Sequence, residues 1–566
     1  MTFPTLNHWL KDICEKSADR EFLIAVDEQG TDCNFTYGQF FESSECVASR
    51  LEEAGLKKGD TAILILPQDA ELLFSIIGCV QRGIIPTVLA FPNFKFDSER
   101  YKIQLNHLVT YLDARWIMSS KKLPEQIDKL IREIVAARPG TTYARIEEID
   151  LGGRPSVKFN LDARSEDVAF LQHSSGTTGL QKGVAITHRS AIQQITHYSG
   201  AMRITPEDGV ASWLPLYHDM GLLACFWLPL LARIPLVQMA PAYWVVQPQE
   251  LLIRMHRHRS TLAWLPNFAF TFLAHRVNDD LLPSNFSMAN IRAFVNCSEP
   301  VLEKSFTDFE ERFRKFGVRP GMLQASYAMA ENTFAVTQTR IAEPPLTDHV
   351  KRDPFQRDNQ AIEAAGGEPA LSFVSSGRAI GGTNIRIVDA AGAVLPDRLI
   401  GEIAVSGDSL MGGYYKREDF TREAVRDGWY YTGDVGYLAG GELYVIGRAK
   451  DLIIIGGKNI YPQDVETIVS EYPGVHPGRV VAVGIFNENI GTEDLCVAAE
   501  LEQKDGLNEA EIRRGIKKSI TDALDIAARH VFFVPPRWIV KSTSGKVSRK
   551  QNREKTIAEF LSKGRG

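Results

Sequence analysis

The chain has 566 residues, of which 44% are hydrophobic and 24% are charged, and its formal net charge is −6. This length predicts several packed units with a large buried core. The composition is typical of soluble globular proteins, and its mildly acidic balance excludes the basic footprint of a nucleic-acid-binding protein. Any polyanionic ligand would therefore have to be held by local residues.

The cysteines and the apolar stretches bear on localisation. Seven scattered cysteines with no C-x-x-C pair favour reduced thiols in a cytoplasmic protein over a disulfide framework or a zinc site. The first 22 residues lack the uninterrupted apolar region of a secretory signal. Residues 222–246 are strongly apolar but contain three prolines and Arg233, so we expect buried core or the wall of an apolar pocket rather than a transmembrane segment.

The N-terminal two thirds of the chain alternate between two patterns. Short apolar runs predict strands and amphipathic stretches predict helices. Strands are expected at 61–67, 86–91, 115–120, 168–172, 236–240 and 293–298, and helices at 70–83 and 249–259. This alternation predicts an α/β fold.

The pattern changes at about residue 370 to short strands separated by Gly, Asp and Pro, which predicts a β-rich subdomain over about 370–447. Residues 451–566 combine strand-like runs, two helical patterns and a basic tail, which predicts a small α+β domain. Residues 1–447 would then form a large N-terminal domain, and the boundary would lie at 448–450.

One loop gathers an unusual set of small polar residues. The stretch FLQHSSGTTGLQKG (170–183) places glycines, hydroxyl side chains and Lys182 between a predicted strand and a strand followed by a helix, whose N-cap is expected at Thr187 or Ser190. Open backbone N–H groups, hydroxyl donors and a lysine suit a triphosphate, although a plain surface turn is the alternative. The spacing is not that of the P-loop, so the phosphate hypothesis depends on further residues.

The hypothesis that this loop binds phosphates depends on five further stretches: NCSEP (296–300), SYAMAE (326–331), YYTGD (430–434), GRAKD (447–451) and KSTSGKVSRK (541–550). Each alone is a weak signal. In this order and at these spacings, over nearly the whole chain, they resemble the adenylate-forming enzymes, which include acyl-CoA synthetases, peptide-synthetase adenylation domains and luciferases. The resemblance implies a large multi-subdomain α/β body and a small mobile C-terminal domain, with Lys450 at the hinge of residues 448–450.

The resemblance also implies an ATP site. The residues that would hold the phosphates are Ser174, Ser175, Gly176, Thr177, Thr178, Gly179 and Lys182. The residues that would line the adenine are Ser298, Glu299, Pro300, Ser326 and Tyr327. Glu331 would help to hold Mg²⁺ between the phosphates, and Asp434 would accept the ribose hydroxyls with Arg448 as a second contact.

Lys546, within TSGK, carries the main catalytic expectation. The resemblance implies that it reaches into the site and neutralises charge on the substrate carboxylate and the α-phosphate as the carboxylate oxygen attacks phosphorus. The alternative is that Lys541, Lys546, Arg549 and Lys550 form a solvated basic tail.

Two stretches, SWLPLYHDMGL (212–222) and PNFAF (266–270), resemble those of the fatty acyl-AMP ligases, a branch that activates fatty acids. His218 would orient the carboxylate or gate the pocket, with a structural histidine as the alternative. The side chains that would bury an alkyl chain, or would simply be core, are Trp213, Leu214, Met220, Leu222, Leu223, Phe226 and Trp227.

A polar, charged stretch at 342–378 is long for a connection inside a compact domain, so it is either functional or a disordered loop. Its part at about 342–372 matches the insertion that distinguishes fatty acyl-AMP ligases from CoA ligases. The resemblance therefore implies that the acyl group passes to an acyl carrier protein, or to a carrier domain of a polyketide or peptide synthase. An acyl-CoA synthetase, an amino-acid or aryl-acid adenylating enzyme and a non-catalytic nucleotide-binding relative remain as alternatives.

Overall fold

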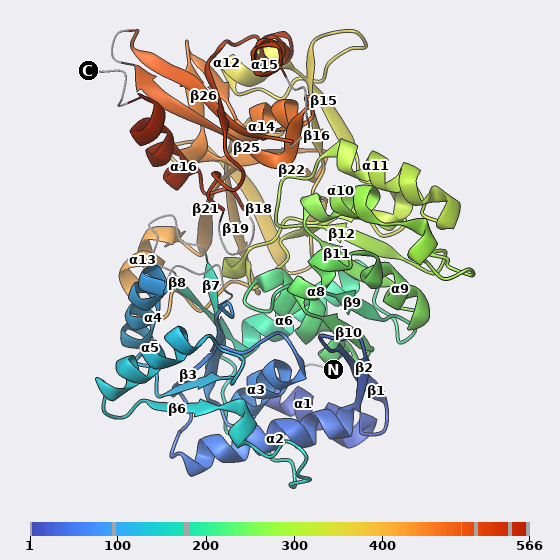
Figure 1. The fold of residues 1–566 in the computed structure, drawn as a ribbon, viewed down its shortest axis with the longest axis vertical. Coiled ribbons are helices and arrows are strands. Elements are labelled where there is room, and N and C mark those ends of the chain that lie inside the picture. The colour runs from blue at the N-terminus through green and yellow to red at the C-terminus, as the bar shows by residue number, and fades with distance from the viewer. Residues whose placement is uncertain are drawn as a thin grey trace.

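The computed structural model describes residues 3–92, 98–174, 182–487, 490–502, 508–541 and 546–561. Figure 1 shows the N-terminal segments (blue to green) in the lower part of the molecule and the C-terminal segments (orange to red) above them. Two large sheets with helices form the lower part, and smaller sheets form the upper part. This confirms the predicted α/β fold class.

The first large sheet has six strands in the order β6-β5-β3-β4-β7-β8. They are β3 (Thr61–Leu64), β4 (Ile85–Val88), β5 (Trp116–Ser119), β6 (Thr142–Arg145), β7 (Val168–Ser174) and β8 (Lys182–Thr187). All neighbours are parallel except β7 and β8, which pair antiparallel on either side of the glycine-rich loop. The helices α4 (Ser98–Leu112) and α5 (Glu125–Ala136) follow β4 and β5.

The second large sheet has seven strands in the order β13-β12-β11-β9-β10-β1-β2. They are β1 (Glu21–Val26), β2 (Asp32–Thr36), β9 (Val210–Ser212), β10 (Leu236–Met239), β11 (Leu262–Leu265), β12 (Ala293–Asn296) and β13 (Leu323–Ala325). The helices associated with it include α1 (Leu6–Ser17), α2 (Tyr37–Glu53), α9 (Gln249–Arg257), α10 (Asn267–Arg276) and α11 (Glu303–Phe313).

Helix α3 (Ala70–Gln81) lies between the two sheets. Phe74 packs edge-on against Phe35 of β2, and the Ser75 hydroxyl lies 3.3 Å from the Met118 sulfur of β5. Burial on both sides explains why this helix is apolar nearly all around instead of along one stripe. At Gly78 a Cβ would lie 2.7 Å from the Ser44 carbonyl oxygen, so glycine permits the close approach of α2.

Besides the two large sheets, the described residues form five smaller ones. The largest of these consists of β18 (Thr383–Val388), β19 (Gly401–Gly407), β20 (Val425–Arg426), β21 (Trp429–Ala439) and β22 (Glu442–Arg448), which overlap the range predicted to be β-rich. The C-terminal segment contains β23 (Ile453–Ile455), β24 (Lys458–Ile460), α14 (Pro462–Ser470), β25 (Val475–Asn487), β26 (Thr492–Leu501), α15 (Glu509–Leu524), β27 (Ala528–Val534) and α16 (Arg549–Thr556). The division into a large and a small mobile domain stays a prediction.

Residues 342–378 contain regular structure, so the disordered-loop alternative is wrong for this segment. Strands β15 (Thr347–Lys351) and β16 (Ala370–Val374) pair antiparallel, and α12 (Arg352–Asp358) follows β15 directly. Phe355 of α12 stacks on Phe373 of β16 in a small buried cluster that also includes Tyr461 of the C-terminal segment. In Figure 1, α12 lies beside α15.

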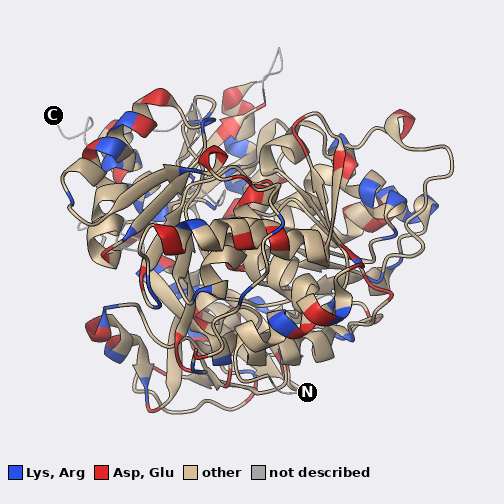
Figure 2. Cartoon of the chain, turned by 90° about the horizontal axis from the view of Figure 1, so that it is seen from below, with Lys and Arg blue, Asp and Glu red and all other residues tan. Residues whose placement is uncertain are grey.

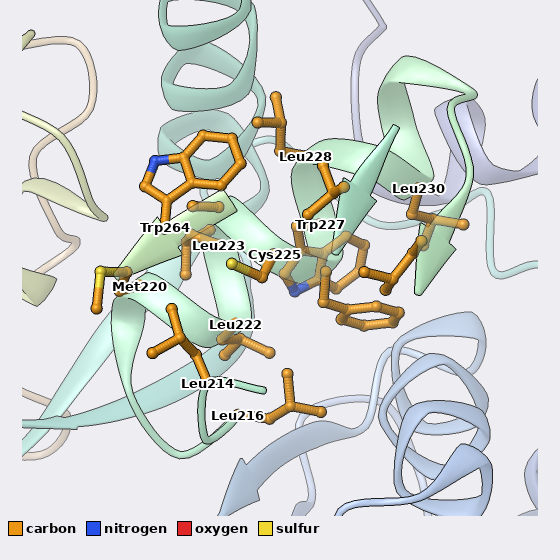
Figure 3. Packing of buried hydrophobic residues seen from close by; sticks show 14 of the residues in the cluster. Leu214, Leu216, Met220, Leu222, Leu223, Cys225, Trp227, Leu228, Leu230 and Trp264 are labelled. Atoms are coloured by element: carbon orange, nitrogen blue, oxygen red, sulfur yellow. The ribbon is translucent and has the colours of Figure 1, made fainter. Parts of the chain in front are cut away.

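Most of the apolar stretch predicted as core or pocket wall is buried in the largest hydrophobic cluster (Figure 3), whereas Val245 and Val246 at its end are exposed. Residues Met220–Trp227 form a π-helix there, capped by the Asp219 carboxylate, which accepts the Met220 N–H at 2.8 Å. At Gly221 a Cβ would lie 2.2 Å from the Pro215 carbonyl oxygen, so only glycine permits this turn. The residues predicted for the alkyl chain are 0–5% exposed and belong to this core.

Figure 2 shows that Lys and Arg positions are interspersed with Asp and Glu positions along the chain. In the part of the chain that the structure describes, no helix is both long enough and apolar enough to cross a membrane.

Candidate active site

Lys546 lies close to the segment that carries His218. Burial, with a smaller contribution from the positive charge of Lys546, lowers the pKa of His218 to about 3. Burial raises the pKa of Asp219 and of the Cys297 thiol, and the charge of Lys546 opposes both shifts. Three groups on two separate segments therefore experience the charge of the Lys546 ammonium.

His218 is poised to act as a neutral group at physiological pH, because its pKa lies far below 7. Its Nε2 atom is shielded from solvent and has no hydrogen-bond partner among the described residues. The ring packs against Tyr217 with centroids 4.6 Å apart. An unpaired buried imidazole nitrogen is costly without a ligand, so the arrangement suits hydrogen bonding to a bound substrate.

Asp434 and Arg448, the predicted ribose contacts, face each other across the β21–β22 hairpin. The Arg448 Nε lies 2.9 Å from the Asp434 Oδ1, and the Tyr327 hydroxyl donates to the Oδ2 at 2.6 Å. The Asp434 charge also raises the pKa of Arg448. The carboxylate is thus held in place from two sides, and Tyr327 links the predicted adenine and ribose residues.

The predicted adenine residues occupy the ends of β12 and β13. Ser298 has a left-handed backbone conformation with φ 73°, and its hydroxyl contacts the Met220 sulfur at 3.9 Å. The Glu299 carboxylate accepts the Phe268 N–H at 3.0 Å, and the Ser326 hydroxyl donates to the Thr337 carbonyl at 2.7 Å. The contacts of Ser298 and Glu299 join the end of β12 to the two stretches that suggested a fatty acid substrate.

The predicted phosphate residues are described only in part. Ser175, Gly176, Thr177, Thr178 and Gly179 lie outside the described residues, as does the side chain of Ser174. Lys182 opens β8, and its Nζ lies 4.8 Å from the ring centroid of Tyr414 and 4.1 Å from that of Phe420. Glu331 is buried, which raises its pKa, and its Oε1 accepts the Tyr414 hydroxyl at 3.0 Å.

The predicted hinge lies where β22 ends. Residues Ala449–Asp451 form a single 3₁₀ turn, and burial lowers the pKa of Lys450. Arg549 is paired with Asp451 at 3.3 Å and with Glu466 at 2.6 Å, so it is not part of a solvated tail. Lys546, three residues before Arg549, is exposed. Its exposure leaves the ammonium free to meet a ligand.

Comparison with known proteins identifies the family. The sequence model described as AMP-binding enzyme matches residues 10–415. The chain belongs to the AMP-binding enzyme family. The predicted relation to adenylate-forming enzymes is therefore confirmed.

Several relatives of this AMP-binding enzyme have names that describe ligases of fatty acids. FadD25 of Mycobacterium tuberculosis, named as a fatty-acid–CoA ligase, is 30% identical, and the match covers 92% of this chain and 91% of that protein. JamA of Moorena producens, named as a medium-chain-fatty-acid–[acyl-carrier-protein] ligase, is 29% identical over 93% of this chain and 90% of its own. A structure from a study of fatty acyl-adenylate ligases of E. coli and L. pneumophila has a TM-score of 0.88 at 26% identity, covering 99% and 98% of the two chains.

Two residues beside the predicted ATP groups, Tyr414 and Phe420, were not predicted from the sequence. Both follow the glycine pair of MGGYYKREDF (411–420), and that pair was the available signal of a close backbone approach. Arg549 was assigned only to the tail, because its partners Asp451 and Glu466 are 98 and 83 residues distant in sequence.

Proposed function

We propose that this AMP-binding enzyme activates a medium- or long-chain fatty acid with ATP to the acyl adenylate, releasing pyrophosphate. It then transfers the acyl group to the phosphopantetheine thiol of an acyl carrier protein. The observation that supports the first step best is that the positive charge of Lys546 acts on both His218 and Asp219. The relatives named as fatty acid ligases support the substrate class.

In the adenylation step a carboxylate oxygen forms a bond to the α-phosphorus, and the bond from that phosphorus to the pyrophosphate oxygen breaks. Two anions must approach each other, and Lys546 supplies the positive charge that offsets their repulsion. His218, neutral at pH 7, donates one hydrogen bond from its Nε2–H to the carboxylate and orients it without adding charge. Asp434, Arg448 and Tyr327 fix the nucleoside end.

The residues also fit a bound Mg²⁺. Glu331 is a buried carboxylate whose Oε1 is held by Tyr414, and carboxylate oxygens are preferred ligands of this ion. Mg²⁺ is held in such sites by one or two carboxylates together with substrate phosphates, so no larger cluster of protein ligands is needed. When bound, the ion would neutralise phosphate charge. Lys182 would contact the same phosphates.

The competing functions are separated by one exchange experiment. We expect ATP–pyrophosphate exchange that depends on added fatty acid and stays at background with amino acids or aryl acids. Exchange driven by an amino acid or aryl acid would contradict the fatty acid assignment. No exchange with any acid, despite ATP binding, would support the non-catalytic alternative and contradict the proposal.

The segment at 342–372 contacts the C-terminal part of the chain and bears on which acceptor the enzyme uses. Arg352 of α12 donates to the carbonyls of Asp522 and Ala523 at 3.4 Å, and Gln356 donates to the Leu524 carbonyl at 3.2 Å. These carbonyls belong to the C-terminal end of α15, so the side chains satisfy groups that the helix leaves unpaired. We propose that through them the segment holds the C-terminal part of the chain in an orientation in which the Lys546 charge acts on His218. The contacts thereby disfavour rotation of the C-terminal part to an orientation in which CoA could reach the acyl adenylate.

Weakening these contacts should therefore allow CoA to act as an acceptor of the acyl group. We expect Arg352→Ala combined with Gln356→Ala to raise the yield of acyl-CoA about tenfold, while fatty-acid-dependent exchange changes little, because the three hydrogen bonds of these side chains restrain the rotation. Asp358→Ala, at an exposed position of the same helix, is the matched control. An unchanged acyl-CoA yield in the double variant would contradict the restraint.

A further inference from the structure

The segment at 411–415 joins the two halves of the predicted phosphate site. It runs alongside β8, with the Gly412 N–H donating to the Ala185 carbonyl at 2.8 Å and the Tyr415 N–H donating to the Gly183 carbonyl at 2.8 Å. The Met411 N–H donates to the Glu331 carbonyl at 2.9 Å. One short stretch is thus bonded both to the strand that begins with Lys182 and to Glu331 itself.

Tyr414 is the side chain of this segment that contacts both functional groups. It is 6% exposed, its ring face lies 4.8 Å from the Lys182 Nζ, and its hydroxyl donates to the Glu331 Oε1 at 3.0 Å. An ammonium is attracted to the face of an aromatic ring, and a buried carboxylate requires hydrogen-bond donors. Tyr414 therefore satisfies both charged groups without allowing them to neutralise each other directly.

Phe420 of α13 (Glu418–Ala424) contacts only one of the two groups. Its ring lies 4.1 Å from the Lys182 Nζ, and Arg417 covers it with its guanidinium carbon 3.6 Å from the ring centroid. Lys182 is therefore in contact with two rings, one of which also reaches Glu331. This asymmetry allows the two contacts of Tyr414 to be tested separately.

We propose that Tyr414 is a positioning residue of the ATP site: its ring directs the Lys182 ammonium, and its hydroxyl fixes one oxygen of Glu331 so that the other is presented to Mg²⁺. The inference rests on the proposed function, because Lys182 and Glu331 are assigned to the phosphates and the ion there. It adds a residue that fixes the relative placement of the two groups.

The test measures nucleotide binding by calorimetry in the absence of fatty acid, with and without Mg²⁺. Tyr414→Phe keeps the ring and removes the hydroxyl, so we expect about tenfold weaker MgATP binding, with ATP affinity in the absence of Mg²⁺ nearly unchanged. Phe420→Leu should weaken ATP binding about threefold, equally with and without Mg²⁺, because it touches only Lys182. In a Glu331→Gln background, Tyr414→Phe should have no further effect on the Mg²⁺ dependence.

The outcomes separate this inference from the function on which it rests. If the unaltered enzyme fails to bind ATP, the proposed function is wrong and the inference with it. If the unaltered enzyme binds MgATP but Tyr414→Phe weakens ATP binding equally with and without Mg²⁺, only the inference is overturned. Additive effects of Tyr414→Phe and Glu331→Gln would overturn it as well. Thermal unfolding of each variant shows whether a loss of binding follows a loss of folding.

Discussion

Replacing Lys546 by alanine is expected to lower fatty-acid-dependent ATP–pyrophosphate exchange by about 100- to 1,000-fold and to leave ATP affinity nearly unchanged. The charge of the ammonium acts on His218, Asp219 and Cys297, and we propose that the substrate carboxylate and the α-phosphate meet near these residues. Its charge is needed most as the carboxylate oxygen forms its bond to the α-phosphorus. The substitution should therefore destabilise the transition state more than it weakens the binding of ATP.

The measurement pairs the exchange rate with ATP binding by the same variant. Lys550→Ala is the matched control, because Lys550 is also exposed and carries the same charge in the adjoining helix α16. We expect it to retain nearly all activity. A loss of ATP affinity as large as the loss of rate in Lys546→Ala would show that the lysine acts on the ground state instead.

Replacing Lys450 by proline is expected to leave acyl-adenylate formation largely intact and to abolish transfer to the carrier protein. Proline fixes φ near −65°, and Lys450 lies in the turn Ala449–Asp451 where rotation of the C-terminal domain is predicted. The Lys546 charge acts on His218 in this structure, so we expect the trapped orientation to be the one that forms the adenylate. Lys450→Ala should support both half-reactions.

Single-turnover formation of the adenylate and its discharge to the carrier are measured separately for the two variants. Equal slowing of both half-reactions by the proline would argue against a hinge at this position. Loss of transfer in Lys450→Ala as well would indicate that the side chain, and not backbone rotation, is required.

Local patterns predicted the secondary structure well where the interactions are local. The capping box of helix α6 (His188–Met202), in which Thr187 accepts the Ser190 N–H, involves residues three apart, and both were expected at the start of the helix. The pairing of Asp434 with Arg448 follows from a hairpin. Such features depend on short sequence separations, which a single sequence makes visible.

The features that were missed depend on tertiary packing. The Tyr414 hydroxyl reaches Glu331 across 83 residues, and α12 reaches the end of α15 across about 170. The π-helix at Met220–Trp227 arises where a uniformly apolar run is buried on all sides, and such a run has no periodicity to predict its register. Only the three-dimensional arrangement selects these partners.

The acceptor preference of the intact enzyme tests the central proposal most directly. The same acyl adenylate would be offered a phosphopantetheine-loaded carrier protein and free CoA under matched conditions, and the two thioesters would be quantified by mass spectrometry. Both acceptors carry the same thiol, so any preference must come from geometry and surface contacts. We predict abundant acyl carrier protein and little acyl-CoA. Efficient formation of acyl-CoA by the intact enzyme would contradict transfer to a carrier as its function.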